Sequence, residues 1–284
     1  MSPAGMDTFP AGDSSQGVTI RIISAAPSNT EIIAGLGLGD RLVAVDKYSR
    51  DVAGINKDLP EIDFFYPNFE VIAGLEPDII LTNEINTNGD DGTPFKFLDR
   101  LGIRVVQIPT SNSIEGIYRD IALIAETLGV SDRGETMIRE MREAIESLTA
   151  QGRTIAEADK KRVYFEITPA PNMVSFGRGT YLNEMIEIIG ARNIFANVSG
   201  WFTPGAEEII RANPDVIFTM TNSGGSLRDR EDTTAELKRR PGFQTINAVQ
   251  QNRIYTVNSN WASRPSQFIV LALSQMRAAV YEEE

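Results

Sequence analysis

Short apolar runs recur along the first half of the chain, each followed by a segment with helical spacing of apolar and polar residues. The run 19–23 is predicted as a buried strand, 31–36 as a helix and 42–45 as the next strand. Further strands of this half are predicted at 78–81 and 105–108. Strand, helix, strand is the order of a parallel α/β sheet, so we expect an α/β domain that begins near Val18.

A long helical pattern separates the two halves of the sequence. Met137, Met141, Ile145 and Leu148 form one apolar stripe at helical spacing, and Ser131 can cap its start. The pattern predicts one unbroken helix over 131–158, which is about 40 Å at 1.5 Å per residue. We expect this helix to join two lobes, although an ordinary long surface helix has the same pattern.

After residue 158 the α/β pattern resumes. Strands are predicted at 162–167, 215–218 and 253–257, with helices at 181–189 and 265–281. The expected fold is therefore two Rossmann-like α/β lobes joined by a single long helix, with a ligand cleft between the lobes. The expected organisation is a disordered leader or tether at 1–17, an N-terminal lobe at 18–130, the connecting helix at 131–158 and a C-terminal lobe at 159–284.

The two halves also contain an internal repeat. Residues 69–82 align without gaps with residues 206–219, and both segments read as a helix, a Pro-Asp pair and a buried strand. Proline ends the helix in each copy because it cannot continue the backbone hydrogen-bond pattern. Helix, Pro-Asp and strand is a common arrangement in α/β folds, but its recurrence supports two similar lobes.

Composition excludes several classes of function. The net charge of −12 argues against a nucleic-acid partner, which needs a positive surface. The chain has no Cys and no His, which excludes disulfides and cysteine nucleophiles and removes the usual zinc ligands and the usual general base. We therefore expect no enzyme, no catalytic residues, no metal site formed by the protein itself and no intrinsic cofactor. No apolar run is long enough to span a membrane.

Two stretches near the start of the chain resemble a known family. Residues 21–33 read RIISAAPSNTEII, and residues 35–45 read GLGLGDRLVAV. Both are similar to the opening of the helical-backbone metal-chelate binding proteins, the iron-siderophore, haem and vitamin B12 receptors of ABC importers. Later stretches fit the same family in the same order, at 67–81, 176–181, 200–215, 241–243, 253–255 and 263–265.

This resemblance implies a solute-binding protein whose lobes close little around the ligand. It also implies export to the periplasm or to the outer face of the membrane, with or without a lipid anchor. The partner that it implies is a permease dimer that works with an ATPase, and we expect the binding protein itself to be a monomer. The start of this chain shows no signal sequence, which we expect to have been removed.

Glu70 and Glu207 occupy equivalent positions in the repeat, near the start of a predicted helix. An acidic residue there also interacts favourably with the helix dipole and needs no partner. The resemblance implies that one glutamate in each lobe pairs with arginines of the permease. Glu208 could take the place of Glu207.

Aromatic and basic residues at predicted loop positions are the candidates for ligand contact. They are Tyr48, Phe65, Tyr66, Phe176, Trp201, Phe202 and Trp261, with Arg178 and Arg264. Parallel sheets bind ligands at the carboxyl ends of their strands, where a ring can stack on a planar ligand or simply fill the core. An arginine there suits an anionic chelate, since its planar fork matches carboxylate or phosphate.

The identity of the ligand stays open. A ferric siderophore supplies all of its own iron ligands, as cobalamin supplies its ring ligands, whereas haem usually requires a protein ligand such as His, Cys, Met or Tyr. We expect a ferric siderophore first, cobalamin second and haem third. An enzyme or a sensor domain on the same two-lobed scaffold is the alternative from another class.

Overall fold

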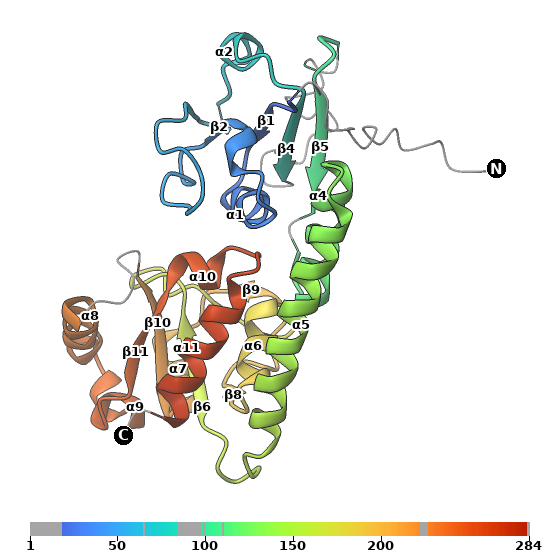
Figure 1. The fold of residues 1–284 in the computed structure, drawn as a ribbon. Coiled ribbons are helices and arrows are strands. Elements are labelled where there is room, and N and C mark those ends of the chain that lie inside the picture. The colour runs from blue at the N-terminus through green and yellow to red at the C-terminus, as the bar shows by residue number, and fades with distance from the viewer. Residues whose placement is uncertain are drawn as a thin grey trace. The chain divides into compact units, whose positions relative to one another are not determined.

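The computed structural model describes residues 19–64, 66–83, 98, 100–109, 111–221 and 227–282 (Figure 1). Their contacts divide the chain into two compact units. Unit 1 comprises the described residues up to Ser111 together with Glu115–Glu140, and unit 2 comprises Asn112–Ile114 and the described residues from Met141 onward. Each unit is built on a parallel β-sheet, which confirms the predicted α/β class.

Unit 1 contains a five-stranded parallel sheet in the order β3-β2-β1-β4-β5. The strands are β1 (Ile22–Ser24), β2 (Leu42–Asp46), β3 (Glu61–Ile62), β4 (Ile79–Asn83) and β5 (Arg104–Ile108), and the helices are α1 (Pro27–Gly35), α2 (Phe69–Gly74) and α4 (Ile114–Thr127), with a 3-10 turn at Gly39–Arg41. The buried core includes Ile23, Ile72 and Ile80, contributed by β1, α2 and β4. Helix α1 begins earlier than predicted, because Pro27 suits the first position of a helix.

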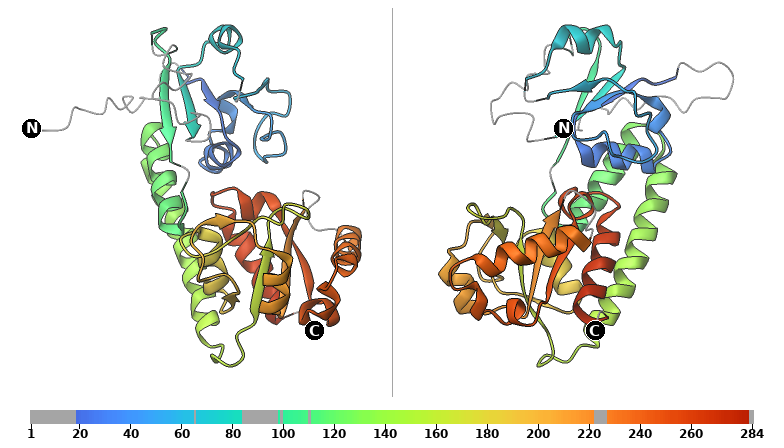
Figure 2. Two further views of the ribbon diagram at one scale, coloured as in Figure 1. Left: turned by 180° about the vertical axis from the view of Figure 1, so that it is seen from behind. Right: turned by 90° about the vertical axis from the view of Figure 1, so that its left-hand side faces the viewer.

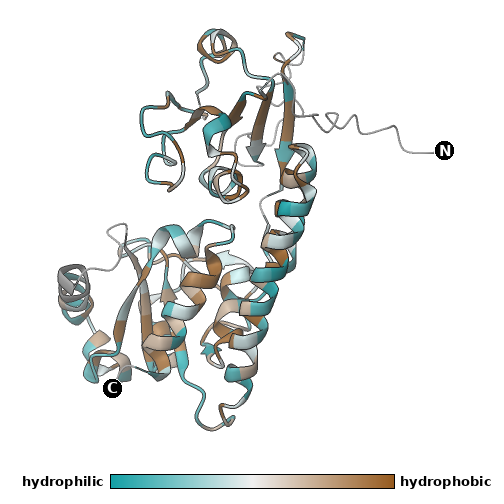
Figure 3. Cartoon of the chain, viewed as in Figure 1, coloured by the Kyte–Doolittle hydropathy of each residue, from teal (hydrophilic) through white to brown (hydrophobic). Residues whose placement is uncertain are grey.

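Unit 2 contains a four-stranded parallel sheet in the order β11-β10-β6-β8 and a separate antiparallel pair, β7 and β9. The strands are β6 (Arg162–Glu166), β7 (Ser175–Phe176), β8 (Arg192–Asn193), β9 (Trp201–Phe202), β10 (Val216–Thr221) and β11 (Ile254–Asn258). The helices are α6 (Tyr181–Ile188), α7 (Ala206–Ala212), α8 (Leu227–Arg239), α9 (Asn247–Gln250), α10 (Ser259–Ser263) and α11 (Ile269–Tyr281), with a 3-10 turn at Phe243–Thr245. Helices lie on both faces of this sheet (Figure 2), and its central strands are apolar (Figure 3).

The long helix α5 (Ser131–Arg153) begins at the predicted residue but ends at Arg153, before the predicted end at Ala158. The Thr154 hydroxyl donates to the Gln151 carbonyl at 2.7 Å, and Asp159 N donates to the Ala156 carbonyl at 2.8 Å, so the chain turns where the helix was expected to continue. The division between the units falls inside α5, after Glu140. The domain borders expected from the sequence, 130/131 and 158/159, stay a prediction.

Two glycines of α5 allow neighbouring backbone to approach closely. A Cβ on Gly134 would lie 2.4 Å from the Cβ of Ala125 in α4, within unit 1. A Cβ on Gly152 would lie 2.2 Å from the carbonyl oxygen of Ile188 in α6, within unit 2. Real side chains do not tolerate such distances, so both packing contacts depend on the absence of a side chain.

The internal repeat is present in the structure at the level of single hydrogen bonds. Asp78 accepts a hydrogen bond from Arg21 N at 2.7 Å, and Asp215 accepts one from Arg162 N at 2.9 Å. Each arginine side chain also donates to a carbonyl at the end of the helix that precedes the Pro-Asp pair. The distance is 2.8 Å to Leu75 in unit 1 and 3.1 Å to Ala212 in unit 2. In both units, the aspartate of the Pro-Asp pair therefore ties the start of one strand to the start of its neighbour.

Candidate functional site

A cavity of about 160 Å³ lies in unit 1 where β1, β2, β3 and β4 end. Its walls are Ala25, Ala26, Pro27, Asp46, Lys47, Tyr48, Ile62, Asp63, Phe64 and Asn83. The carboxyl edge of a parallel sheet is where α/β proteins bind ligands. Of the expected site residues, Tyr48 is in this wall.

Polar contacts fix the loop that carries Tyr48. The buried Asp46 carboxylate, 4% exposed, accepts from Tyr48 N at 2.8 Å and from the Ser49 hydroxyl. Lys47 Nζ donates to Asp63 Oδ2 at 2.7 Å, and that hydrogen bond raises the pKa of the Lys47 ammonium. The same ammonium lies 5.2 Å from the centre of the Tyr48 ring. The loop therefore holds the phenol at the rim of the cavity.

Tyr66 lies outside this cavity wall. Tyr48 is 57% exposed and Tyr66 is 87% exposed, so both present large apolar surfaces to solvent. Tyr66 precedes helix α2 and is held by a turn in which its backbone N donates to the Asp63 carbonyl at 3.2 Å. Phe65 lies outside the described residues.

In unit 2 the expected aromatic residues separate into core and surface. Phe176 is 0% exposed and packs edge-on against Phe165, with ring centres 5.5 Å apart. This placement corrects the expectation that Phe176 contacts ligand, because pairing of β7 with β9 turns its ring into the core. Trp201 covers the Phe176 ring at 5.8 Å and remains 47% exposed. Phe202 is half-buried and packs against Phe195 at 5.1 Å.

The two expected arginines and Trp261 also belong to unit 2. Arg178 is exposed, and its Nη1 donates to the Asn197 carbonyl at 2.7 Å, which anchors one end of the guanidinium. Trp261 is half-buried in α10, whose first turn is capped by the Asn258 side chain. Arg264 is half-buried just after the end of α10.

The structure distinguishes between the two glutamates at the start of α7. Glu208 Oε2 accepts from Gly205 N at 2.8 Å, so this carboxylate caps the start of its own helix. Glu207 is exposed, and among the described residues its carboxylate has no hydrogen-bond or ion-pair partner. Glu70 is also exposed in the first turn of α2, where the Asn68 side chain supplies the cap. Glu207 is therefore the structural counterpart of Glu70.

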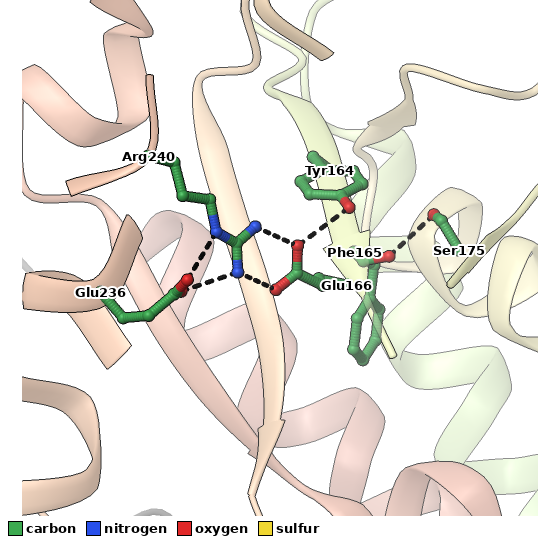
Figure 4. Close-up of polar contacts among 6 residues, drawn as sticks. All are labelled: Tyr164, Phe165, Glu166, Ser175, Glu236 and Arg240. Atoms are coloured by element: carbon green, nitrogen blue, oxygen red, sulfur yellow. Dashed lines mark hydrogen bonds and ion pairs between the residues drawn. The ribbon is translucent and has the colours of Figure 1, made fainter. Parts of the chain in front are cut away.

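A buried ion-pair cluster in unit 2 was not found from the sequence (Figure 4). Arg240 donates to both oxygens of Glu166, at 2.6 and 2.8 Å, and to Glu236 at 2.7 Å. Tyr164 also donates to Glu166, at 3.1 Å, and burial together with this carboxylate raises the pKa of the Tyr164 phenol above its usual value. Glu166 is nearly inaccessible to solvent, so the cluster is structural. The sequence signal that could have indicated this cluster is Glu166, a carboxylate directly after the apolar residues 163–165 of β6.

A second, more open hollow of about 350 Å³ lies in unit 2 beside the end of α5 and the second half of α6. Its wall combines Arg153 and Lys160 with Glu184 and Glu187. Glu184 accepts a hydrogen bond from Ile114 N at 2.9 Å, and burial raises the pKa of its carboxyl group. The mixture of both charges selects no particular ligand.

Within 19–64, 66–83, 98, 100–109, 111–221 and 227–282, no group of three or more acidic side chains is placed to hold a metal ion. In those same ranges, no helix combines the length and the apolar character needed to cross a bilayer.

Comparison with known proteins gives consistent results. The sequence profile described as "Periplasmic binding protein" matches residues 22–260. The chain is 29% identical over 278 residues to the "Uncharacterized ABC transporter substrate-binding lipoprotein YvrC" of Bacillus subtilis, covering 95% of this chain and 84% of the relative. It is 27% identical over 265 residues to a "Vitamin B12-binding protein" of Vibrio campbellii, covering 90% and 87% of the two chains.

Solved structures have the same fold. A possible iron-binding, periplasmic solute-binding protein of Staphylococcus epidermidis has a TM-score of 0.78 and 30% identity, covering 92% of this chain and 98% of the other. A periplasmic haem-binding protein of Vibrio cholerae has a TM-score of 0.80 and 23% identity, covering 93% of this chain and 100% of the other. The second likeness concerns the fold alone.

Proposed function

The chain belongs to the periplasmic binding protein family, and we propose that it captures a metal chelate outside the cytoplasm and delivers it to the permease of an ABC importer. It is a solute-binding protein and not an enzyme. The observation that carries the delivery step is the pair Glu70 and Glu207. These two carboxylates are exposed at equivalent places of the two units, whereas the neighbouring Glu208 is engaged within its own helix.

The proposed ligand is a chelate that supplies every ligand of its own metal ion. The chain has no His or Cys, the two strongest protein ligands for haem iron, so haem ranks below the other chelates. We place a ferric siderophore first, supported by the relative from Staphylococcus that is described as a possible iron-binding protein, and cobalamin second, supported by the vitamin B12-binding relative from Vibrio.

The proposed ligand contacts are a subset of those expected from the sequence. In unit 1 they are Tyr48 and Tyr66, which are strongly exposed. In unit 2 they are Trp201, Trp261, Arg178 and Arg264, with Phe202 supporting them from its half-buried position. Phe176 is not part of the proposal because it has no exposed surface.

The proposed location follows from the same relatives. The Bacillus relative is a lipoprotein, and the Staphylococcus relative is described as a possible periplasmic solute-binding protein. We propose that this chain works as a monomer in the periplasm or on the outer face of the membrane, with a lipid anchor as one form of attachment. Globomycin, which blocks lipoprotein processing, would alter the size of the cell-made protein only if it is lipidated.

A binding screen tests the capture step. Both tryptophans are proposed ligand contacts, so a bound chelate should quench their fluorescence. Titration with a panel of ferric siderophores, cobalamin and haem should give saturable quenching for one class, with recovery of unmodified ligand after denaturation. No saturable binding of any metal chelate, or release of an altered product, contradicts the proposal.

Charge-removing variants test the delivery step. Glu70→Gln and Glu207→Gln should each weaken binding to the cognate permease in lipid discs, because stranding a desolvated partner charge commonly costs about 2–5 kcal/mol. Ligand affinity should not change. The matched control is Glu208→Gln, whose amide oxygen can still accept from Gly205 N, so both stability and permease binding should stay close to those of the wild type. Equal permease binding by all three variants and the wild type refutes the assignment.

A further inference from the structure

The cavity in unit 1 has the size and lining of a site for one small ring. Its volume is about 160 Å³, and engineered apolar cavities of about 150 Å³ bind benzene. Ala25, Ala26, Ile62 and Phe64 are all buried hydrophobic residues in its wall. Pro27 adds a further apolar surface, and its ring has no N–H to be satisfied. A flat apolar group can pack against this apolar part of the wall.

The charges around the cavity restrict the group that can enter. Asp46 and Asp63 are both in the wall, and Lys47 is the one cation among the wall residues. The Lys47 ammonium is engaged by Asp63 at 2.7 Å, so the buried Asp46 makes the wall negative overall. A carboxylate or phosphate would be repelled at this short range. The cavity therefore favours an uncharged ring.

One position of the cavity wall carries a different side chain in the repeat copy of unit 2. Ile22 pairs with Ile79 in unit 1, and Val163 pairs with Val216, the repeat equivalent of Ile79, in unit 2. Ala25 lies three residues after Ile22, and Glu166 lies three residues after Val163, so the two residues occupy equivalent positions. In unit 2 this position carries the side chain that Arg240 holds at 2.6 and 2.8 Å.

We propose that this cavity is a subsite that receives a single uncharged aromatic ring carried by the chelate, while the rest of the ligand lies outside it. The exposed Tyr48 ring at the rim contacts the neighbouring part of the ligand. This inference rests on the proposed function, since it names a part of the same ligand. It excludes chelates that are anionic at this position and those that lack any ring small enough to enter.

The first experiment uses wild-type protein and free rings as probes. Saturation-transfer NMR should detect phenol in fast exchange, with a Kd of about 1 mM as expected for so small a ligand. Benzoate, which has a similar ring and a negative charge, should bind at least 10-fold more weakly. Equal binding of the two probes, or no binding of phenol, overturns the proposal whether or not any chelate binds.

Two variants locate the probe. Ala25→Leu fills the cavity and should abolish the phenol signal, whereas the matched control Ala150→Leu, at an exposed position of α5, should leave it unchanged. Phe64→Ala enlarges the cavity and should admit 2-naphthol, which the wild type excludes. If Ala25→Leu does not fold, judged by circular dichroism, the naphthol result decides alone. Phenol binding that neither change affects refutes the site.

The chelate separates this proposal from the proposed function. Once a chelate has been identified by the tryptophan screen, Ala25→Leu should weaken its binding at least 10-fold, and phenol should compete with it. A chelate that binds Ala25→Leu like the wild type refutes the subsite but leaves the proposed function standing. A wild-type protein that binds phenol but no chelate refutes the proposed function instead.

Discussion

Exchanging one methyl group between α4 and α5 tests how closely these helices pack. Gly134→Ala places a Cβ only 2.4 Å from the Cβ of Ala125, where ordinary methyl contacts are about 3.5–4.0 Å. The helices must separate by about 1 Å or more, and overpacking of this kind costs about 1–3 kcal/mol. The gain in helix propensity is about 1 kcal/mol, so we expect a net loss of up to about 2 kcal/mol.

The second single variant, Ala125→Gly, should lose stability for a different reason. Ala125→Gly loses about 1 kcal/mol of helix propensity and about 0.8 kcal/mol of methyl burial. The double variant, Gly134→Ala with Ala125→Gly, restores one methyl to the same space and leaves the total propensity unchanged. We expect its stability to be close to that of the wild type, which corresponds to a coupling energy of at least about 2 kcal/mol.

Urea unfolding followed by circular dichroism at 222 nm measures the four corners of this cycle. Tryptophan fluorescence from the same samples reports unit 2 only, since Trp201 and Trp261 both lie there, and so separates a local effect from a global one. Gly74→Ala is the control, because a Cβ there meets nothing within 4 Å and should be neutral or stabilising. Additive single effects, or a stabilising Gly134→Ala, would falsify this account of the contact.

Two further predictions concern charged groups of unit 2. Arg240→Met should cost about 3–5 kcal/mol in urea unfolding because it leaves Glu166 buried without its cation, whereas adding Glu166→Leu should recover most of the loss. A single variant as stable as the double one would contradict this. Glu184 has a raised pKa in the folded protein, so the folded state binds this proton more tightly than the unfolded chain. Its stabilising contribution is complete below the usual glutamate pKa and is lost as pH rises through the higher folded value. Relative to Glu184→Gln, the wild type should therefore be more stable in acid than at neutral pH, and a constant difference across this range refutes the shift.

Much of the fold could be predicted because apolar periodicity reports burial directly. The strand predicted at 42–45 is found at Leu42–Asp46, and the helix predicted at 181–189 is found at Tyr181–Ile188. The end of α5 was misplaced because the residues after Arg153 keep helix-compatible side chains. The chain turns there through hydrogen bonds of Thr154 and Asp159 that no apolar pattern reveals.

The site was harder to predict because exposure depends on the direction of single side chains. Phe176 and Trp201 lie on paired strands of one small sheet, yet the first is buried and the second is exposed. Asp46 directly follows the strand predicted at 42–45, and no apolar pattern reveals that it is a buried acceptor that orients Tyr48. The choice between Glu207 and Glu208 needed the capping hydrogen bond from Gly205, which sequence spacing alone leaves open.

The buried pair of Glu166 and Arg240 limits the mutations by which unit 2 can change. Replacing either residue alone strands a buried charge at a cost of about 3–5 kcal/mol, while replacing both together can be nearly neutral. Most domains have only about 5–15 kcal/mol of stability in total, so a lineage that passes through either single substitution loses a large part of it. Once acquired, the pair is therefore kept by strong epistasis. A small residue like Ala25 can replace Glu166 in unit 2 at low cost only if Arg240 changes with it or if stabilising changes elsewhere come first.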